Sequence, residues 1–242
     1  MKINRETYFQ IKQSLQAGQV LVAVSKLQPV EAILELYQLG HRDFGENYVQ
    51  ELLSKQAQLP ADIRWHFIGH LQSNKVKYIA PFVHLIHGVD SEKLLKEIDK
   101  QSVKNNRCIP CLLQVHIAEE ETKFGFDENE VKEFITQNFF HYTAADTKKS
   151  GAVICGLMGM ASFSDDENKI RNEFKHLRHI YKELNKWFKE KNACSPTNSP
   201  NLEPLNLLSM GMSSDYTIAL EEGSNMLRIG SLLFGARQYN KT

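Results

Sequence analysis

Short apolar runs alternate with longer amphipathic segments along most of the chain. The run at 20–26, Val-Leu-Val-Ala-Val-Ser-Lys, is rich in β-branched residues and is typical of a strand buried on both faces. Pro29 predicts the start of a helix through Leu39, and Gly40 is a stop signal. By the same reasoning, strands are predicted at 20–26, 43–47, 65–69, 85–89, 110–117, 153–160, 205–210 and 226–234. Helices are predicted at 4–17, 29–39, 48–58, 73–80, 91–105, 128–138, 165–189 and from 214 or 215 to 222.

The number of these segments limits the fold class. Eight strand candidates, most of them followed by a helix, fit a (β/α)8 TIM barrel, and the 242 residues are near the typical length of about 250. An open doubly wound sheet uses the same alternation, so the count favours the barrel without excluding that alternative. The segment 191–204 is rich in Pro, Asn and Ser and predicts a surface loop. Because the roughly 40 residues after it are too few to fold alone, we expect one domain over 1–242.

Composition and charge narrow the class of protein. Lys plus Arg and Asp plus Glu number 29 each, so the formal net charge is zero and no nucleic-acid partner is indicated. No stretch reaches the roughly 18 apolar residues of a membrane span, and the charged N-terminal segment does not resemble a signal peptide. The cysteines are too few for a disulfide scaffold. They are Cys108, Cys111, Cys155 and Cys194. We therefore expect a cytoplasmic protein with no membrane partner.

Lys26 stands at the end of the first predicted strand, directly after apolar core residues. In a barrel this position lies on the C-terminal face, where active sites are built. One interpretation is a lysine whose aliphatic stem packs on the strand while its amine reaches water. The other is an amine that forms a Schiff base with a carbonyl ligand.

Two turns rich in Gly and Ser follow the seventh and eighth predicted strands, at 208–215 and 227–235. Barrels often bind phosphate with these two loops, using backbone N–H groups and hydroxyls. Glycine also lets the backbone approach a ligand closely. The two turns predict a phosphate site and favour the Schiff-base interpretation of Lys26.

Several longer stretches resemble one family. They are Ala23–Lys26, Phe44–Glu51, His66–Lys75, Lys123–Gly125, Gly156–Met160, Leu208–Asp215 and Arg228–Gly235. In this order they resemble the YggS/PROSC-type pyridoxal phosphate homeostasis proteins, which bind pyridoxal 5′-phosphate (PLP) in a barrel of the alanine racemase N-terminal domain type. His70 and the longer segment 191–204 depart from the family pattern, and neither is a ligand position implied by the resemblance.

The resemblance implies a role for each of seven residues. Lys26 would hold PLP as a Schiff base, and Asn47 would lie near the cofactor ring. Ser209, Gly230 and Ser231 would hold the phosphate, helped by the backbone of Met210. Arg228 would approach the pyridine nitrogen and, being protonated, would keep that nitrogen unprotonated.

The same resemblance leads us to expect a carrier of PLP that takes part in intracellular PLP homeostasis without efficient catalysis. Racemases of similar fold obtain a second base from an additional domain, and we expect this chain, which ends at Thr242, to lack one and to be a monomer. Tyr48 and Lys123 are conceivable substitutes for that base, although a solvated role is the simpler reading of each. Two alternatives stay open. One is a PLP-dependent racemase or lyase acting on a small amino acid, and the other is a sugar-phosphate enzyme in which Lys26 forms a Schiff base with its substrate.

The remaining motifs indicate ordinary structural roles and no metal site. Cys108 and Cys111 have CxxC spacing, but no second pair follows for zinc, and the pair leads into a strand. His66 and His70 are four residues apart on a predicted strand and would therefore share one face, as a metal-binding pair could, yet no carboxylate is nearby in the sequence to complete a metal site. A further histidine pair three residues apart, at 84 and 87, is expected to point to opposite faces. The acidic run 119–121 predicts a solvated loop.

Overall fold

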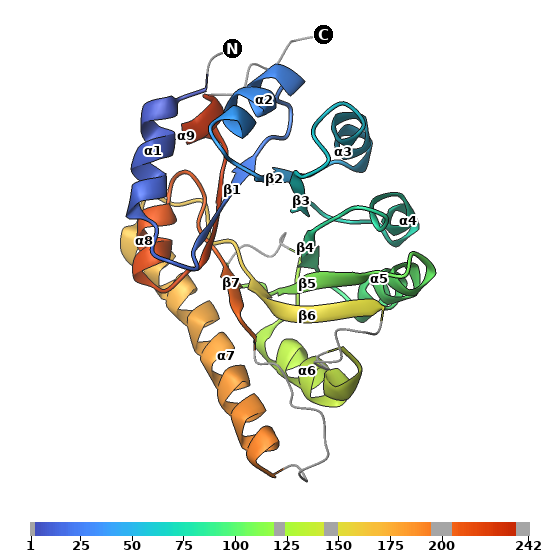
Figure 1. Ribbon diagram of the computed structural model, residues 1–242. Helices are drawn as coiled ribbons and strands as arrows, with labels where there is room; N and C mark the ends of the chain where they lie inside the picture. The colour runs from blue at the N-terminus through green and yellow to red at the C-terminus, as the bar shows by residue number, and fades with distance from the viewer. Residues whose placement is uncertain (1–2, 119–123, 143–149, 195–204, 236–242) are drawn as a thin grey trace.

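The computed structural model describes residues 3–118, 124–142, 150–194 and 205–235, and within these the strands form a closed barrel of eight parallel strands. The strands are β1 (Val20–Val24), β2 (Asp43–Glu46), β3 (Arg64–Phe67), β4 (Leu85–Val89), β5 (Cys108–Gln114), β6 (Gly151–Met158), β7 (Leu207–Ser209) and β8 (Met226–Ile229). Each strand pairs with the next in the sequence, and β8 pairs with β1 to close the ring (Figure 1). This closure excludes the open doubly wound sheet and confirms the predicted TIM barrel.

Helices surround the strands on the outside of the barrel (Figure 1). They are α1 (Arg5–Ser14), α2 (Val30–Gln38), α3 (Val49–Gln56), the 3-10 turn η1 (Ser73–Lys75), α4 (Val76–Ile79), α5 (Glu92–Lys104), α6 (Glu128–Tyr142), α7 (Glu167–Cys194), α8 (Tyr216–Glu221) and α9 (Ser231–Phe234). The hydroxyl of Ser91 accepts a hydrogen bond from the backbone N–H of Leu94 and caps α5, as expected for serine at this position. No helix in the described part of the chain is both long enough and apolar enough to cross a membrane.

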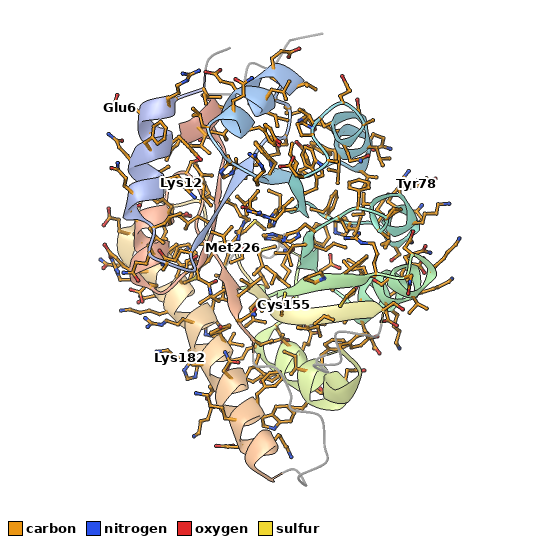
Figure 2. The ribbon with its side chains drawn as sticks, in the orientation of Figure 1. Glu6, Lys12, Tyr78, Cys155, Lys182 and Met226 are labelled. Atoms are coloured by element: carbon orange, nitrogen blue, oxygen red, sulfur yellow. The ribbon has the colours of Figure 1, made fainter. Side chains whose placement is uncertain are left out.

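Two separate apolar clusters stabilise the barrel. The smaller one joins side chains from different strands, among them Val22, Leu112 and Met226, and fills part of the barrel interior. The larger one packs the outer face of the strands against the helices. Figure 2 shows the labelled Met226 near the middle of the ring, whereas the labelled Tyr78 and Lys182 lie on its periphery. The strands are therefore buried on both faces, which explains why the β1 sequence is continuously apolar.

The predicted strand at 226–234 is wrong in its second half. Strand β8 ends at Ile229, and after Gly230 the chain turns into the short helix α9. Leu233 and Phe234 are buried in the outer core, and the Leu233 carbonyl accepts a hydrogen bond from the backbone N–H of Asn4 at 2.7 Å. An apolar run this short fits a buried strand or a buried helical turn equally well, so periodicity could not separate the two.

Candidate functional site

A pocket of about 450 Å³ opens at the carboxyl ends of the strands. Its walls come from the segments that follow β1, β2, β3, β6, β7 and β8, together with the ends of β1 and β8. The lining residues are Val24, Lys26, Asn47, Ile68, Met160, Phe163, Met212, Ser213, Ser214, Arg228, Gly230, Ser231 and Leu232. The carboxyl ends of the strands are where barrels place their ligand sites, so we call this pocket the rim pocket.

Five of the seven residues predicted to bind a ligand line the rim pocket. They are Lys26, Asn47, Arg228, Gly230 and Ser231. The other two, Ser209 and Met210, are completely buried and do not line it. Ser209 lies beneath the pocket against Arg228, and Met210 belongs to the outer core.

The turn after β1 fixes the direction of the Lys26 side chain. Leu27 adopts a positive φ of 61°, which is unusual for a residue other than glycine. Its backbone N–H donates to a carboxylate oxygen of Glu51 at 2.5 Å, and the N–H of Gln28 donates to the Ser25 carbonyl. The turn is therefore held on both sides of Lys26, whose side chain reaches the pocket.

A buried ion cluster anchors this turn. The Lys55 amine donates to the Ser25 carbonyl at 2.7 Å, to Glu46 at 2.8 Å and to Glu51 at 2.6 Å. The Ser25 hydroxyl also donates to Glu46 at 2.6 Å. Burial raises the pKa of Glu46, and the positive charge of Lys55 opposes that shift. One buried ammonium group thus connects the residues on either side of Lys26 to strand β2 and helix α3.

Asn47 presents an acceptor without a donor. Its side-chain Oδ1 is buried and makes no hydrogen bond within the described structure. Behind it, a Cβ on Gly69 would lie 2.4 Å from the Asn47 carbonyl oxygen, so only glycine fits there. An unpaired buried carbonyl oxygen costs free energy, and a donor on a ligand in the pocket would remove that cost.

Arg228 contributes a buried positive charge to the pocket floor. Its guanidinium donates from Nη1 to the Ser209 hydroxyl at 2.6 Å and from Nη2 to the Gly159 carbonyl at 2.9 Å. Burial lowers the pKa of Arg228 to about 10, while the Asp215 carboxylate acts in the opposite direction. The group stays protonated at neutral pH, and no described carboxylate lies within ion-pair distance of it.

The wall formed by the loops after β7 and β8 is rich in hydrogen-bond donors. Ser213, Ser214 and Ser231 supply hydroxyls, and the N–H of Gly230 donates to the Ser213 hydroxyl at 3.3 Å. No side chain caps the start of α9 at Gly230. Sequence reasoning did not single out Ser213 and Ser214, although both belong to the Gly/Ser-rich turn at 208–215 that it identified. These groups form a corner suited to an anion.

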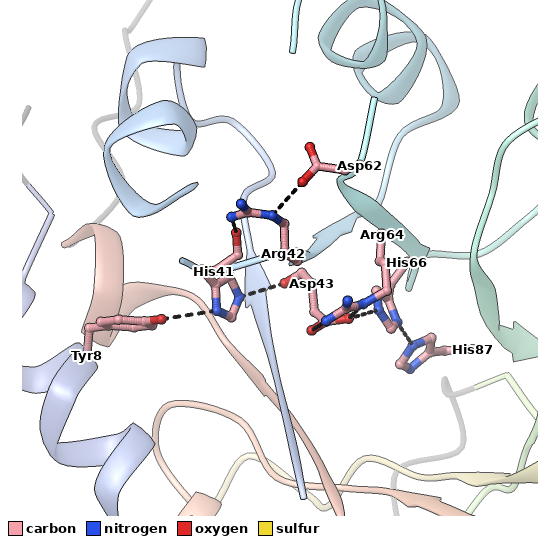
Figure 3. A network of polar contacts seen from close by, with 8 residues as sticks. All are labelled: Tyr8, His41, Arg42, Asp43, Asp62, Arg64, His66 and His87. Atoms are coloured by element: carbon pink, nitrogen blue, oxygen red, sulfur yellow. Dashed lines mark hydrogen bonds and ion pairs between the residues drawn. The ribbon is translucent and has the colours of Figure 1, made fainter. Parts of the chain in front are cut away.

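A second pocket of about 410 Å³ lies at the opposite, amino-terminal ends of the strands, and we call it the lower pocket. Asp43, Arg64, His66 and His84 are among its lining residues. Arg64 makes two hydrogen bonds to the Asp43 carboxylate, at 2.7 and 2.5 Å, and Nε2 of His66 lies 3.1 Å from the same carboxylate (Figure 3). Burial alone would raise the pKa of Asp43, but the hydrogen bonds from Arg64 and His66 hold it well below its usual range.

The histidine predictions need three corrections. His70 lies beyond the end of β3, where it contacts Asp90 at 3.0 Å and not His66. A carboxylate does reach His66, but it comes from Asp43 on the neighbouring strand, which spacing in the sequence could not show. His84 and His87 do not diverge, because both rings contact the ring of His66. The ligand atoms of Asp43, His66 and His84 lie within 4.8 Å of one another, but Arg64 already occupies Asp43.

The cysteine pair agrees with a structural role. Cys108 is exposed and Cys111 is buried, both are free thiols, and both lie within β5. Lys123, the acidic run 119–121 and residues 195–204 lie outside the described residues. The first four residues of the predicted loop 191–204 belong to helix α7, which ends at Cys194, so the loop was predicted to begin too early. Tyr48 is 54% exposed and does not line the rim pocket.

His41, part of the same polar network, predicts a pH dependence of stability (Figure 3). Its Nε2 donates to the Asp43 carbonyl at 2.8 Å, and burial lowers the pKa of His41 to about 4. An unfolded chain binds this proton below a pH of about 6.5, so stability is lost as the pH falls from there towards the folded-state pKa. We expect the contribution of His41 to the free energy of unfolding to fall by about 2 kcal/mol between pH 7 and pH 5.

Urea unfolding of the wild type and of His41→Phe at these two pH values measures this contribution. Phenylalanine preserves the ring contacts with Tyr8 and Phe44 but does not titrate. The loss of stability between pH 7 and pH 5 should be about 2 kcal/mol smaller in the variant. An equal loss in both proteins would show that His41 does not carry the effect.

Comparisons with known proteins agree on the family. The family model described as "Alanine racemase, N-terminal domain" matches residues 5–238. A pyridoxal phosphate homeostasis protein of Aquifex aeolicus is 40% identical over 220 residues, which cover 90% of this chain and 87% of that protein. The structure of PipY from Synechococcus elongatus with PLP bound superposes with a TM-score of 0.79 at 32% identity and covers 95% of this chain and 99% of that one. An alanine racemase from E. faecalis, at 16% identity and a TM-score of 0.64, shares the fold over 95% of this chain and 57% of its own.

Proposed function

The chain belongs to the alanine racemase N-terminal domain family and, within it, to the pyridoxal phosphate homeostasis proteins, and from this premise we propose that it holds PLP in the rim pocket as a carrier. A relative that bears this family name is 40% identical to this chain, and the match extends over most of both chains. PipY binds PLP in its solved structure. The observation in this chain that supports the proposal most directly is the convergence of Lys26 and Arg228 on one pocket.

The chemistry of the pocket matches the three functional groups of PLP. The hydroxyls and N–H groups of the loops after β7 and β8 would hold the phosphate, with Gly230 and Ser231 at its centre. The side-chain oxygen Oδ1 of Asn47, which lacks a donor, would face the cofactor ring. Apolar lining residues such as Ile68 and Met160 would pack on the ring faces.

We propose that Lys26 holds the cofactor covalently. Its neutral amine would condense with the aldehyde carbon of PLP, so that a C=N bond forms and the aldehyde oxygen leaves as water. The reaction is reversible, and hydrolysis would return free PLP and the lysine amine. Such reversibility suits a protein that stores and releases the cofactor.

Arg228 would set the electronic state of the bound cofactor. A guanidinium that stays protonated at neutral pH can only donate a hydrogen bond, so a pyridine nitrogen beside it would remain an unprotonated acceptor. When bound, PLP acts as an electron sink, and it does so most strongly with that nitrogen protonated. Arg228 would therefore favour binding over carbanion chemistry.

The composition of the pocket wall also favours a carrier over a racemase. Apart from Lys26 and Arg228, the lining residues in the described part of the chain carry no acid or base near neutral pH. Two-base proton exchange on opposite faces of a substrate needs a second such group. A PLP-dependent enzyme remains the alternative, supported by the shared fold with alanine racemases.

Equilibrium dialysis with PLP, followed by chiral analysis of L-alanine incubated with the loaded protein, tests the proposal. We expect one PLP per chain and no racemisation or loss of alanine beyond that given by free PLP. Turnover above free PLP would establish the enzyme reading. Absence of PLP binding would overturn the proposal and favour the sugar-phosphate alternative.

We also propose that residues 1–242 act as one unit and as a monomer in the cytoplasm. The barrel closes on itself within the described residues, so no strand edge of its sheet is open to a second copy. Light scattering of the loaded protein should give the mass of one chain, and the mass of two would contradict the monomer.

A further inference from the structure

A line of buried polar side chains crosses the barrel interior from the lower pocket to the rim pocket. Nε2 of His66 lies 3.1 Å from Oδ1 of Asp43, and Nδ1 of His66 lies 3.0 Å from Nε2 of His87 (Figure 3). Nδ1 of His87 lies 3.3 Å from the hydroxyl of Ser209, which in turn accepts from Arg228 at 2.6 Å. The five residues stand on β2, β3, β4, β7 and β8, and all are buried.

The two ends of this line fix the direction of every hydrogen bond in it. A guanidinium only donates, so the Ser209 oxygen accepts from Arg228 and its single hydroxyl proton must point to Nδ1 of His87. His87 then carries its proton on Nε2 and donates to Nδ1 of His66. His66 donates from Nε2 to Asp43, and an ionised carboxylate only accepts. In this arrangement each of the two histidine rings carries a single proton, on Nε2.

The surroundings of His87 oppose a second proton on its ring. His87 is completely buried, and the charged or titratable groups that act on it are His66, His84 and Arg228, none of them acidic. Burial, followed by the repulsion from these three groups, lowers the pKa of His87 well below its usual value. If Nδ1 of His87 carried a proton, the Ser209 oxygen would accept hydrogen bonds from both His87 and Arg228. The hydroxyl proton of Ser209 could then not be donated to His87.

Arg228 needs such an arrangement because it is a buried cation without a direct carboxylate partner among the described residues. Aligned hydrogen-bond dipoles that end at the Asp43 carboxylate stabilise a positive charge at the other end. The same alignment holds the guanidinium against Ser209 and so sets which of its N–H groups remain for a ligand in the rim pocket.

We propose that His87, His66 and Ser209 are positioning residues, which form a one-way hydrogen-bond relay linking Asp43 in the lower pocket to the orientation of Arg228 in the rim pocket. The effect on PLP rests on the proposed function, since it requires that Arg228 contact the bound cofactor. The direction of the relay does not rest on it, because it follows from the five side chains alone.

The first experiment tests the relay without the cofactor. Long-range ¹H–¹⁵N correlation spectra of histidine-labelled protein distinguish the two neutral tautomers and the protonated ring, and the His87→Gln and His66→Gln variants assign the signals. At pH 7 we expect the Nε2–H tautomer for both His66 and His87. A proton on Nδ1 of either ring, or a charged ring, would overturn the relay whether or not the protein binds PLP.

The second experiment tests the link to the cofactor pocket. His87→Phe keeps the ring volume but removes both hydrogen bonds, whereas His87→Gln can still donate and accept. We expect PLP to bind about tenfold more weakly to His87→Phe, with a shifted visible absorbance band, and His87→Gln to stay within about threefold of the wild type.

A substitution at the other end of the relay tests the same link independently of His87. Asp43→Asn lies at the far end of the relay, where the half-exposed Arg64 can turn to water. It should also weaken PLP binding, by about three- to tenfold. If the wild type binds PLP and both His87→Phe and Asp43→Asn bind it equally well, the positioning role is wrong, although the proposed function stands. If the wild type binds none, the proposed function fails and the tautomers alone decide the relay.

Discussion

Replacing Lys26 with alanine is expected to abolish the visible Schiff-base absorbance that added PLP produces and to weaken PLP binding by about 100-fold or more, which corresponds to about 2.7 kcal/mol. The reason is that no other lysine lines the rim pocket in the described structure. The hydroxyls and N–H groups of the loops after β7 and β8 remain in this variant. Weak PLP binding without the visible band should therefore persist. Lys75→Ala is the matched control, because this lysine follows β3 in the turn η1 and does not line the pocket.

Absorbance titration with PLP measures both variants. Wild type and Lys75→Ala should give the same band and the same dissociation constant, while Lys26→Ala gives no band at any PLP concentration. A band of unchanged intensity in Lys26→Ala would place the covalent attachment elsewhere.

Lys55→Met is expected to destabilise the protein by about 3–5 kcal/mol, the typical cost of removing one partner of a buried ion pair. Methionine keeps the apolar stem but leaves Glu46, which is fully buried, and Glu51 without the shared ammonium group. The Ser25 carbonyl next to Lys26 loses a donor as well. We therefore expect the variant to bind PLP more weakly in addition to being less stable.

Two comparisons isolate the buried charge as the cause. Adding Glu46→Gln to Lys55→Met should recover part of the stability, because the uncompensated carboxylate is gone. Lys96→Met, at an exposed pair with Glu92, should change stability little. Urea unfolding measures all three, and a Lys55→Met variant as stable as Lys96→Met would contradict the account of the cluster.

The barrel could be predicted because its strands are buried on both faces and its helices on one. Val20–Val24 is apolar throughout, and the segments between the strands carry the wider spacing of amphipathic helices. Alternation alone left the doubly wound sheet open, since the pairing of β8 with β1 is a long-range contact that no local pattern records. The short helix α9 was taken for the end of a strand because its apolar run is too short for periodicity to distinguish the two.

The candidate site was predictable where a residue type and a strand end coincide, as at Lys26 and at the Gly/Ser turns. It was less predictable where a strand passes into a loop, because the alternation of a strand no longer fixes the direction of a side chain there. Ser209 points beneath the pocket towards Arg228, while Ser213, four residues later, lines the wall. The roles of the seven residues towards PLP stay predictions.

The relay across the interior could not be predicted at all. Its members Asp43, His66, His87, Ser209 and Arg228 come from five strands spread over nearly two hundred residues. Sequence spacing invited pairing of His66 with His70, whereas closure of the barrel brings His66 to Asp43 and His87. Only the folded barrel shows which of these polar groups form hydrogen bonds with one another.

The attachment of PLP to Lys26 is tested most directly by borohydride reduction of the wild-type protein after it has been loaded with PLP, followed by peptide mapping by mass spectrometry. Reduction converts a C=N bond to a stable amine, so the modified lysine can be located in the sequence. The account predicts one phosphopyridoxyl group per chain, on the peptide that contains Lys26. A modification spread over surface lysines, or concentrated on another lysine, would contradict it.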